Sequence, residues 1–212
     1  MQSAFDIAAD LDTPVSAYLK LAPFQPRFLL ESVEGGERLG RYSFIGFGDS
    51  MEFRLTGDTY WVNGDSAPAP TTSDGLLNVL REALDRAPKP RPEIPGLPFA
   101  GGLVGTTGFE MNKRFENIAA GGEMDAAYTA PKSVLAFDHV TRRAALLYDG
   151  SDDDRAKLRN EVIDALRGPL PARPSITPHA KPTPSLKRDV FLSSVKRVKE
   201  YITAGDVYQL VL

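Results

Sequence analysis

Residues 41–64, RYSFIGFGDSMEFRLTGDTYWVNG, decide the fold that we expect of this chain. The β-rich runs Arg41–Phe47 and Met51–Thr56 are followed by Thr59–Val62, which is bounded by the turn dipeptides Gly-Asp and Asn-Gly. Short runs of β-branched and aromatic residues between such dipeptides are typical of hairpins. With the earlier run Arg27–Ser32, this pattern predicts a sheet of antiparallel strands.

Helices are expected before and after these strands along the chain. Thr13-Pro14 is a helix start, because Thr can cap the first turn and Pro loses no hydrogen bond there. Thr72–Asp85 has apolar residues at helical spacing, and the acidic Ser151–Asp154 opens a further helix that runs to Arg167. A second hairpin is predicted from Lys132–His139 and Ala144–Tyr148. The fold class is therefore α+β, with antiparallel sheets and packed helices.

Two proline-rich stretches divide the chain further. The first, Pro88–Pro98, is expected to be an extended connector that leads into a glycine-rich strand over Phe99–Phe109, where another backbone or a ligand comes close. The second predicts three parts: a domain over residues 1–168, a linker over 169–185, and the start of another domain over 186–212. In that last part we expect a helix followed by a buried strand, Val207–Leu212. A strand without partners indicates a piece of a longer protein.

Composition limits the class of function. The chain has 212 residues, of which 42% are hydrophobic, and 25 Lys and Arg stand against 28 Asp and Glu. Such balance argues against nucleic acid or an anionic membrane as the main partner. Because there is no cysteine, disulfides, thiol nucleophiles and Cys-ligated metals are excluded. No apolar run is long enough to span a bilayer and no signal peptide is indicated, so we expect a cytoplasmic protein.

Several motifs have simple structural explanations. The glycine pair Gly46 and Gly48 lacks the third glycine of a dinucleotide-binding loop, because Met51 stands there. The carboxylates of Asp152–Asp154 point in different directions on a helix, so helix capping explains them better than a metal site does. Neither His139, beside a hairpin turn, nor His179, in the linker, is a credible catalytic base.

One constellation suits the binding of a free amino acid. Glu31 and Ser32 end an apolar run, and Arg41 opens the next one. An amino acid needs a carboxylate for its ammonium group, a donor for its carboxylate and apolar walls for its side chain. The alternative is that Glu31 faces water at a strand end and pairs loosely with Arg38 or Arg41.

Five ordered motifs together resemble the anthranilate synthase component I family of chorismate-utilising enzymes. They are Thr13–Val15, Phe28-Leu-Leu-Glu-Ser32, Gly40-Arg-Tyr-Ser-Phe-Ile-Gly46, Phe99-Ala-Gly-Gly-Leu-Val-Gly105 and Tyr201-Ile-Thr-Ala-Gly-Asp-Val-Tyr-Gln-Leu-Val-Leu212. Members of this family convert chorismate and ammonia to anthranilate and pyruvate in tryptophan biosynthesis. The resemblance implies that residues 1 to 168 form the N-terminal regulatory domain and that the chorismate contacts lie in a part of the enzyme beyond Leu212.

The resemblance also implies an effector site and partners. Leu30, Glu31, Ser32 and Arg41 are expected to contact the feedback inhibitor L-tryptophan, in agreement with the amino-acid constellation. No catalytic or metal-binding residue is expected in this segment, apart from Gln209 at the family's nucleophile-side strand position. A neutral amide there favours amination over hydration. Mg²⁺ is expected to bind the C-terminal domain, and a glutamine amidotransferase subunit is expected to supply ammonia.

Two alternatives stay open at this stage. The first is component I of aminodeoxychorismate synthase, a folate-pathway relative with the same ammonia chemistry, whose distinguishing residues lie beyond Leu212. The second is an amino-acid-binding module without catalysis. Binding of tryptophan by residues 1–212 alone would favour the second alternative.

Overall fold

The computed structural model describes residues 4–31, 40–116, 124–172 and 180–212. The chain divides into two compact units, Met1–Pro171 and Ala172–Leu212. The first unit contains the sheet and its covering helices, and the second contains one helix, α5 (Arg188–Ala204). Each unit is described separately below.

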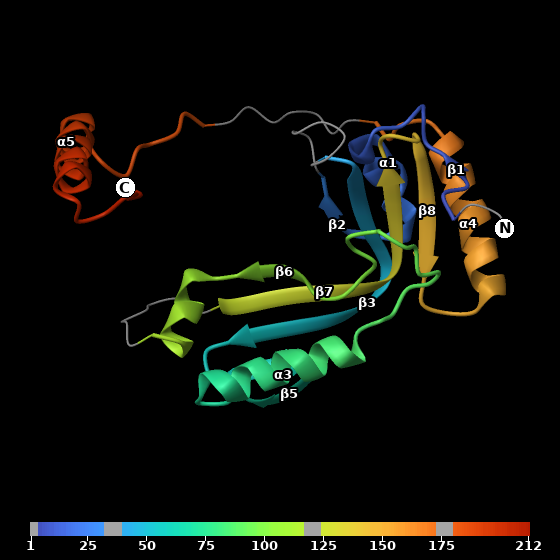
Figure 1. Ribbon diagram of the computed structural model, residues 1–212, viewed down its shortest axis with the longest axis horizontal. Helices are drawn as coiled ribbons and strands as arrows, with labels where there is room; N and C mark the ends of the chain where they lie inside the picture. Colours follow the sequence, from blue (N-terminus) through green and yellow to red (C-terminus); the bar gives the residue numbers. More distant parts are fainter. Residues whose placement is uncertain (1–3, 32–39, 117–123, 173–179) are drawn as a thin grey trace. The chain divides into compact units, whose positions relative to one another are not determined.

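The first unit is built on a pair of long antiparallel strands, β3 (Tyr42–Thr56) and β7 (Met124–Asp138), which run side by side over nearly their whole length (Figure 1). We call the part around Tyr42–Phe47 the near half of the sheet and the part around Ser50–Thr56 the far half. In the near half the order is β1-β8-β7-β3-β2, and in the far half it is β6-β7-β3-β4-β5. The shorter strands are β1 (Ile7–Ala8), β2 (Pro26–Leu30), β4 (Thr59–Val62), β5 (Asp65–Pro68), β6 (Val104–Thr107) and β8 (Arg143–Tyr148).

A β-bulge marks the boundary between the two halves. The pair Phe47 and Ser133 is followed by the pair Ser50 and Pro131, so Gly48 and Asp49 of β3 face the single residue Lys132 of β7. Gly48 has φ +79°, a conformation that glycine adopts without strain. An extra residue in one strand bends it and increases its twist. Figure 1 shows β3 and β7 turning along their length, so that the two halves of the sheet run in different directions.

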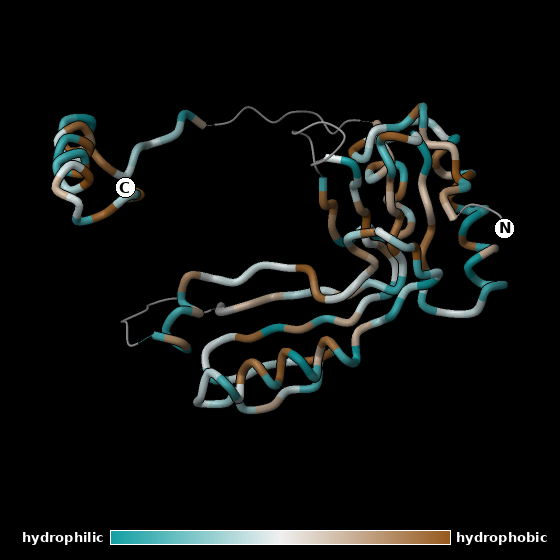
Figure 2. Tube along the Cα trace, viewed as in Figure 1, coloured by the Kyte–Doolittle hydropathy of each residue, from teal (hydrophilic) through white to brown (hydrophobic). Residues whose placement is uncertain are grey.

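Helices cover one side of each half. The helices α1 (Pro14–Lys20) and α4 (Asp152–Arg167) pack on the near half, and α3 (Ser73–Arg86) packs on the far half. All three begin at the hydroxyl caps that favour a first turn, Thr13, Ser151 and Thr72. Hydrophobic and hydrophilic residues alternate around α3 (Figure 2), as expected of an amphipathic helix. Two short 3-10 helices, η1 (Ala22–Phe24) and η2 (Phe109–Arg114), follow α1 and β6.

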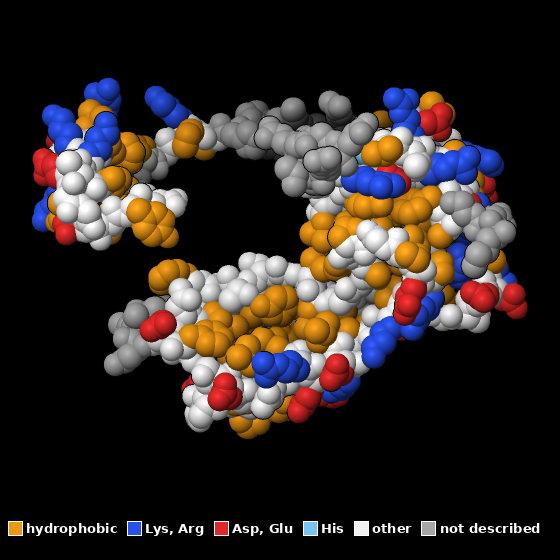
Figure 3. Space-filling model, in the orientation of Figure 1, with side chains coloured by type: hydrophobic (Ala, Val, Ile, Leu, Met, Phe, Trp, Pro, Cys, Tyr) orange, Lys and Arg blue, Asp and Glu red, His pale blue; other side chains and the backbone are white. Residues whose placement is uncertain are grey.

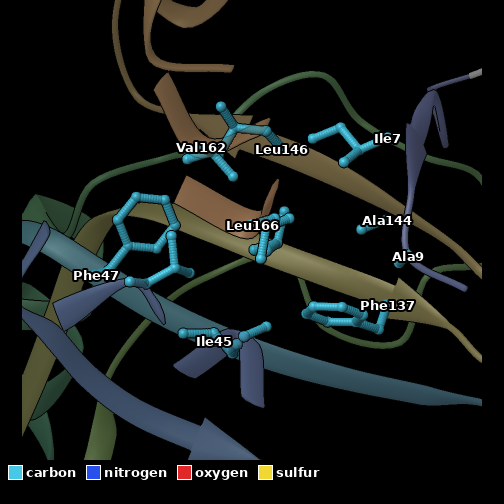
Figure 4. Close-up of a cluster of buried hydrophobic side chains, with 12 residues drawn as sticks. Ile7, Ala9, Ile45, Phe47, Phe137, Ala144, Leu146, Val162 and Leu166 are labelled. Atoms are coloured by element: carbon cyan, nitrogen blue, oxygen red, sulfur yellow. The ribbon is translucent and has the colours of Figure 1, made fainter. Parts of the chain in front are cut away.

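Three groups of buried side chains hold the first unit together. The first lies between the near half and the helices α1 and α4, and Figure 4 shows its side chains converging from the strands and from α4. The second lies between the far half and α3, around the fully buried Phe53 and Leu76. The third occupies the opposite face of the near half, around Phe44 and Leu147. Because β3 contributes to all three, it links the packing of the whole unit.

The predicted α+β class is confirmed, and so are the helix starts at Thr13 and Ser151 and the second hairpin. The runs Arg41–Phe47 and Met51–Thr56 are one strand rather than two, because the bulge at Gly48 bends β3 without ending its pairing with β7. The glycine-rich strand covers only Val104–Thr107, since Gly101 and Gly102 have φ values of +151° and +112°, outside the range of strands.

The prediction of a buried strand over Val207–Leu212 is wrong. The structure assigns no strand there, and Tyr208 and Val211 are 94% and 86% exposed. A strand exists through hydrogen bonds to a neighbour, and the described part of the second unit contains no other strand. The helix that precedes it was predicted correctly, and it ends at Gly205 in the left-handed conformation that favours glycine.

Candidate functional site

The residues predicted to bind an amino acid lie at one end of the near half. Leu30 is the last residue of β2, it lies directly opposite Phe44 of β3, and its side chain is 38% exposed. Glu31 follows it and is exposed. Ser32 and Arg38 lie outside the described residues. Since residues directly opposite each other share a face, Leu30 lies on the face that carries Phe44, away from α1 and α4.

Arg41 is paired with Asp138 rather than with Glu31. Its guanidinium group donates two hydrogen bonds to this carboxylate, from Nε to Oδ1 at 3.1 Å and from Nη2 to Oδ2 at 2.7 Å. The Asp138 side chain is only 2% exposed, whereas that of Arg41 is 44% exposed. The guanidinium carbon lies 4.9 Å from the centre of the Tyr42 ring, a cation–π distance. The alternative pairing of Glu31 with Arg41 is therefore not observed.

We call Leu30, Glu31 and Arg41, at this end of the near half, the corner. The contacts between Arg41 and Asp138 set its charge. The hydrogen bond from Arg41 holds the pKa of Asp138 below its ordinary value, against the opposing effect of burial, and the Val140 N–H donates to the same carboxylate at 3.0 Å. The pairing also raises the pKa of Arg41. Both groups are thus charged at neutral pH. Asp138 uses only two of the five guanidinium N–H groups, and within the described residues Arg41 forms no other side-chain hydrogen bond, so the remaining groups can donate to an anionic ligand.

Aromatic side chains form an apolar surface beside this ion pair, which we call the aromatic floor: Phe28, Tyr42, Phe44 and Phe99. Phe99, which directly follows the connector Pro88–Pro98, meets Phe44 and Phe28 edge to face, with ring centres 5.2 Å and 6.0 Å apart. Tyr42 lies next to them, with its ring centre 6.3 Å from that of Phe44. Figure 3 shows hydrophobic side chains gathered over β2 and the adjoining strands. The fold therefore brings Leu30, an aromatic floor and a cation onto one face.

Asp138 and His139 were not predicted as members of this corner. The Ser43 hydroxyl, which is fully buried, lies 2.8 Å from Nε2 of His139, and the His139 N–H donates to the Arg41 carbonyl at 2.9 Å. These partners come from a strand about 97 residues further along the chain. No local pattern marks them. They could have been predicted only from the antiparallel pairing of β3 with β7, because this pairing brings the start of β3 next to the end of β7.

Gln209 belongs to the second unit, where it is exposed and lies outside any helix or strand. Across residues 4–31, 40–116, 124–172 and 180–212, no group of three or more His, Cys, Asp or Glu side chains is placed to hold a metal ion. In that same part of the chain, no helix is both long and apolar enough to cross a membrane.

Comparison with known proteins assigns the family. The model of the chorismate binding enzyme family matches residues 25–212, which include the strands of the candidate site and both units. The chain belongs to the chorismate-binding enzyme family. The match includes Leu30, Glu31, Arg41, Asp138 and Gln209.

Named relatives within this family agree with one another. Anthranilate synthase component 1 of Thermus thermophilus is 35% identical, over 96% of this chain and 45% of the relative. The protein of the same name from Neisseria meningitidis serogroup B is 34% identical, over 97% of this chain and 45% of the relative. The chain thus spans a little under half the length of these chorismate-family relatives.

A solved structure supports the fold. The crystal structure of anthranilate synthase component I from Streptococcus pneumoniae TIGR4 matches with a TM-score of 0.57 at 23% sequence identity. The match covers 97% of this chain and 47% of that one. At this identity the likeness concerns the fold alone.

Proposed function

We propose that this chain is the N-terminal, tryptophan-sensing part of an anthranilate synthase component I. The observation that carries the proposal is the agreement between the relatives and the corner formed by Leu30, Glu31 and Arg41. The relatives that carry this name align with 96–97% of the chain. The corner offers an exposed carboxylate, a cation that uses two of its five N–H groups on Asp138, and an aromatic floor.

The proposed chemistry belongs to the complete enzyme. There, chorismate and ammonia would give anthranilate and pyruvate in the cytoplasm, and a glutamine amidotransferase subunit would supply the ammonia. The chorismate contacts and a Mg²⁺ site would lie in the portion of the family's length that this chain does not cover. Because these contacts would lie outside the 212 residues, we propose that this segment alone is inactive.

The proposed role of the corner is to bind L-tryptophan. The ammonium group would meet the Glu31 carboxylate, and the carboxylate would accept hydrogen bonds from Arg41 and Ser32. The indole ring would lie against Leu30 and the neighbouring aromatic rings, where apolar surface is already gathered. A ligand that also touches another domain would bias the arrangement of the two, and so would regulate a distant active site.

The test uses the full-length enzyme that contains this chain. With ammonia and Mg²⁺ supplied, Glu31→Ala is expected to raise the tryptophan concentration for half-inhibition by about tenfold or more, because one charge-assisted contact is lost. The matched control is Glu82→Ala, at an exposed position of α3, which should leave inhibition unchanged. Inhibition of Glu31→Ala at the wild-type concentration would contradict the proposal.

The reaction product separates this proposal from its nearest alternative. An anthranilate synthase releases a fluorescent product, whereas an aminodeoxychorismate synthase does not release anthranilate. Formation of aminodeoxychorismate by the full-length enzyme would assign the chain to the folate-pathway relative. Tight tryptophan binding by residues 1–212 without any turnover in the full-length enzyme would favour a binding module.

A further inference from the structure

A second pocket lies at the β-bulge, where the near and far halves of the sheet meet. It has a volume of about 310 Å³ and is formed by η1 and the residue after it, the bulge of β3, β7, the end of β8 and α4. Phe47 and Leu158, which line it, belong to the core beneath α1 and α4. The proposed tryptophan corner lies on the opposite face of the sheet. We call this second site the bulge pocket.

One side of the bulge pocket is apolar. Phe24 and Phe47 meet edge to face, with ring centres 6.0 Å apart, and Phe47 is 1% exposed. Leu158 of α4 is half-buried beside them. This wall suits a small aliphatic side chain, because it offers hydrophobic surface that is held in place by the core.

Two opposite charges line the other side. The bulge sets Asp49 and Lys132 on adjacent strands, and both side chains are exposed. Within the described parts of the chain neither of them forms an ion pair or a side-chain hydrogen bond, with each other or with any other group. Both charges are therefore available to a ligand.

Two hydroxyl groups complete the lining. Ser133 is 3% exposed, and as far as the structure describes the chain its hydroxyl has no hydrogen-bond partner. Because this hydroxyl lines the pocket, it can donate a hydrogen bond to a ligand or accept one from it. The half-buried Tyr148 lines the same pocket and also makes no hydrogen bond through its side chain within these residues.

The backbone around the pocket is held in unusual conformations. Gln25 has φ +54° and Gly48 has φ +79°, and the Gly48 N–H donates to the Gln25 carbonyl at 3.3 Å. The side chain of Arg27 adds a hydrogen bond to the Gly48 carbonyl at 3.4 Å. These contacts fix η1 against the bulge, so the polar and apolar walls are present before a ligand arrives.

We propose that the bulge pocket binds a free aliphatic α-amino acid. Its ammonium group pairs with Asp49, and its carboxylate pairs with Lys132 and accepts hydrogen bonds from the Ser133 and Tyr148 hydroxyls. Its side chain packs on Phe24 and Leu158. A simple anion would use Lys132 and leave Asp49 repelling it, whereas a zwitterion uses both charges and the apolar wall. The site does not depend on the proposed function.

The test measures binding of L-leucine and two analogues by calorimetry. The first analogue, 3-methylbutylamine, lacks the carboxylate, and the second, 4-methylpentanoate, lacks the ammonium group. Leucine is expected to bind at least about tenfold more tightly than either, because each analogue leaves one charge of the pocket unpaired. Lys132→Gln and Asp49→Asn should each weaken leucine binding by a similar factor. The matched control is Lys157→Gln on exposed α4, which should bind leucine as the wild type does.

A further variant tests the Ser133 hydroxyl. Ser133→Ala should weaken leucine binding while leaving the stability of the ligand-free protein near that of the wild type, because within the described residues the hydroxyl makes no hydrogen bond. Absence of leucine binding at millimolar concentration, or equal binding by the Lys132→Gln/Asp49→Asn double variant, would overturn the proposal. Glu31→Ala tests whether the bulge pocket is independent of the tryptophan corner. It should leave leucine binding unchanged, whatever its effect on tryptophan.

Discussion

Arg41 and Asp138 join two strand ends that lie 97 residues apart in the sequence. The carboxylate is almost completely buried, and it accepts hydrogen bonds from the guanidinium group and from the Val140 N–H. Such charge-assisted hydrogen bonds are stronger than neutral ones. The pair therefore links the start of β3 to the end of β7. It also holds Arg41 over Tyr42, where a ligand on the aromatic floor can reach it.

Replacing this carboxylate should change stability in a pH-dependent way. Because the pKa of Asp138 is lowered in the folded protein, its charge stabilises the fold above the unfolded-state pKa of about 3.9. That contribution disappears as the pH falls through the lowered folded pKa. Asp138→Asn should thus lower the urea midpoint at pH 7 and lose this difference as the pH falls through the lowered folded-state pKa of Asp138.

The control for this prediction is Asp65→Asn, at an exposed position of β5, which should unfold like the wild type at pH 7. An equal urea midpoint for Asp138→Asn and the wild type at pH 7 would contradict the stabilising role of the ion pair. A difference that persists unchanged in strong acid would show that the carboxylate's charge is not its source.

Single residues of the candidate site could be predicted only where a short motif contains them. Leu30, Glu31 and Ser32 are consecutive, and Arg41 begins the next β-rich run, so the sequence suggested all four. Asp138 and His139 of this site, and Lys132 of the bulge pocket, could not be found in the same way. Their roles depend on which residue lies opposite them, and that register is set by pairing between distant strands.

Element by element, the sequence predicted the helices better than the strands. Hydroxyl caps and apolar spacing are local, and they located the first residues of α1, α3 and α4 to within about a residue. Arg41–Phe47 and Met51–Thr56 were predicted as separate runs, yet Gly48 and Asp49 between them form a bulge within the single strand β3. A glycine with positive φ can occur in a turn that ends a strand or in a bulge within one. Here the pairing of β3 with the long strand β7 on both sides of Gly48 makes it a bulge.

Gly105 is expected to control the pairing of β6 with β7. A Cβ atom at this position would lie 2.0 Å from the Ala127 carbonyl oxygen and 2.7 Å from Cα of Tyr128, so backbone would have to move. Gly105→Ala should therefore destabilise the fold by about 1–3 kcal/mol. Amide hydrogen exchange across Val104–Thr107 should also become faster. Thr106→Ala, in the same strand, should have a smaller effect, and protection of β6 equal to that of the wild type would contradict this prediction.

The first turn of α1 depends on a reciprocal cap. The Thr13 hydroxyl accepts a hydrogen bond from the Ser16 N–H at 3.1 Å, and the Thr13 N–H donates to the Ser16 hydroxyl at 3.0 Å. Thr13→Ala should lower the free energy of unfolding by about 1 kcal/mol, measured by urea denaturation. Thr71→Ala, in the exposed segment before α3, is the control and should have no measurable effect. A similar loss in both variants would exclude the cap as the cause.

At the scale of the molecule, the near and far halves share their two longest strands. The groups of buried side chains beneath α1 and α4, and beneath α3, both include residues of β3 and β7. Sequence patterns predicted the antiparallel sheet but not this continuity, because the bend that separates the halves depends on the bulge. Val207–Leu212 illustrates the converse limit. An apolar run has the composition of a strand, but composition does not supply the neighbouring strand that it needs.

Shared strands predict that the first unit unfolds as one cooperative structure. Ile45 is fully buried in the near half, and Trp61, the single tryptophan, lies on β4 in the far half. Ile45→Ala should destabilise the fold by about 2–5 kcal/mol. The urea midpoint seen by Trp61 fluorescence should fall as far as the midpoint seen by circular dichroism, because β3 and β7 transmit the loss across the bulge. Leu84→Ala, at a half-exposed position of α3, should change both midpoints much less. If the two halves unfold independently, Ile45→Ala will leave the fluorescence midpoint at its wild-type value while the circular dichroism transition splits in two.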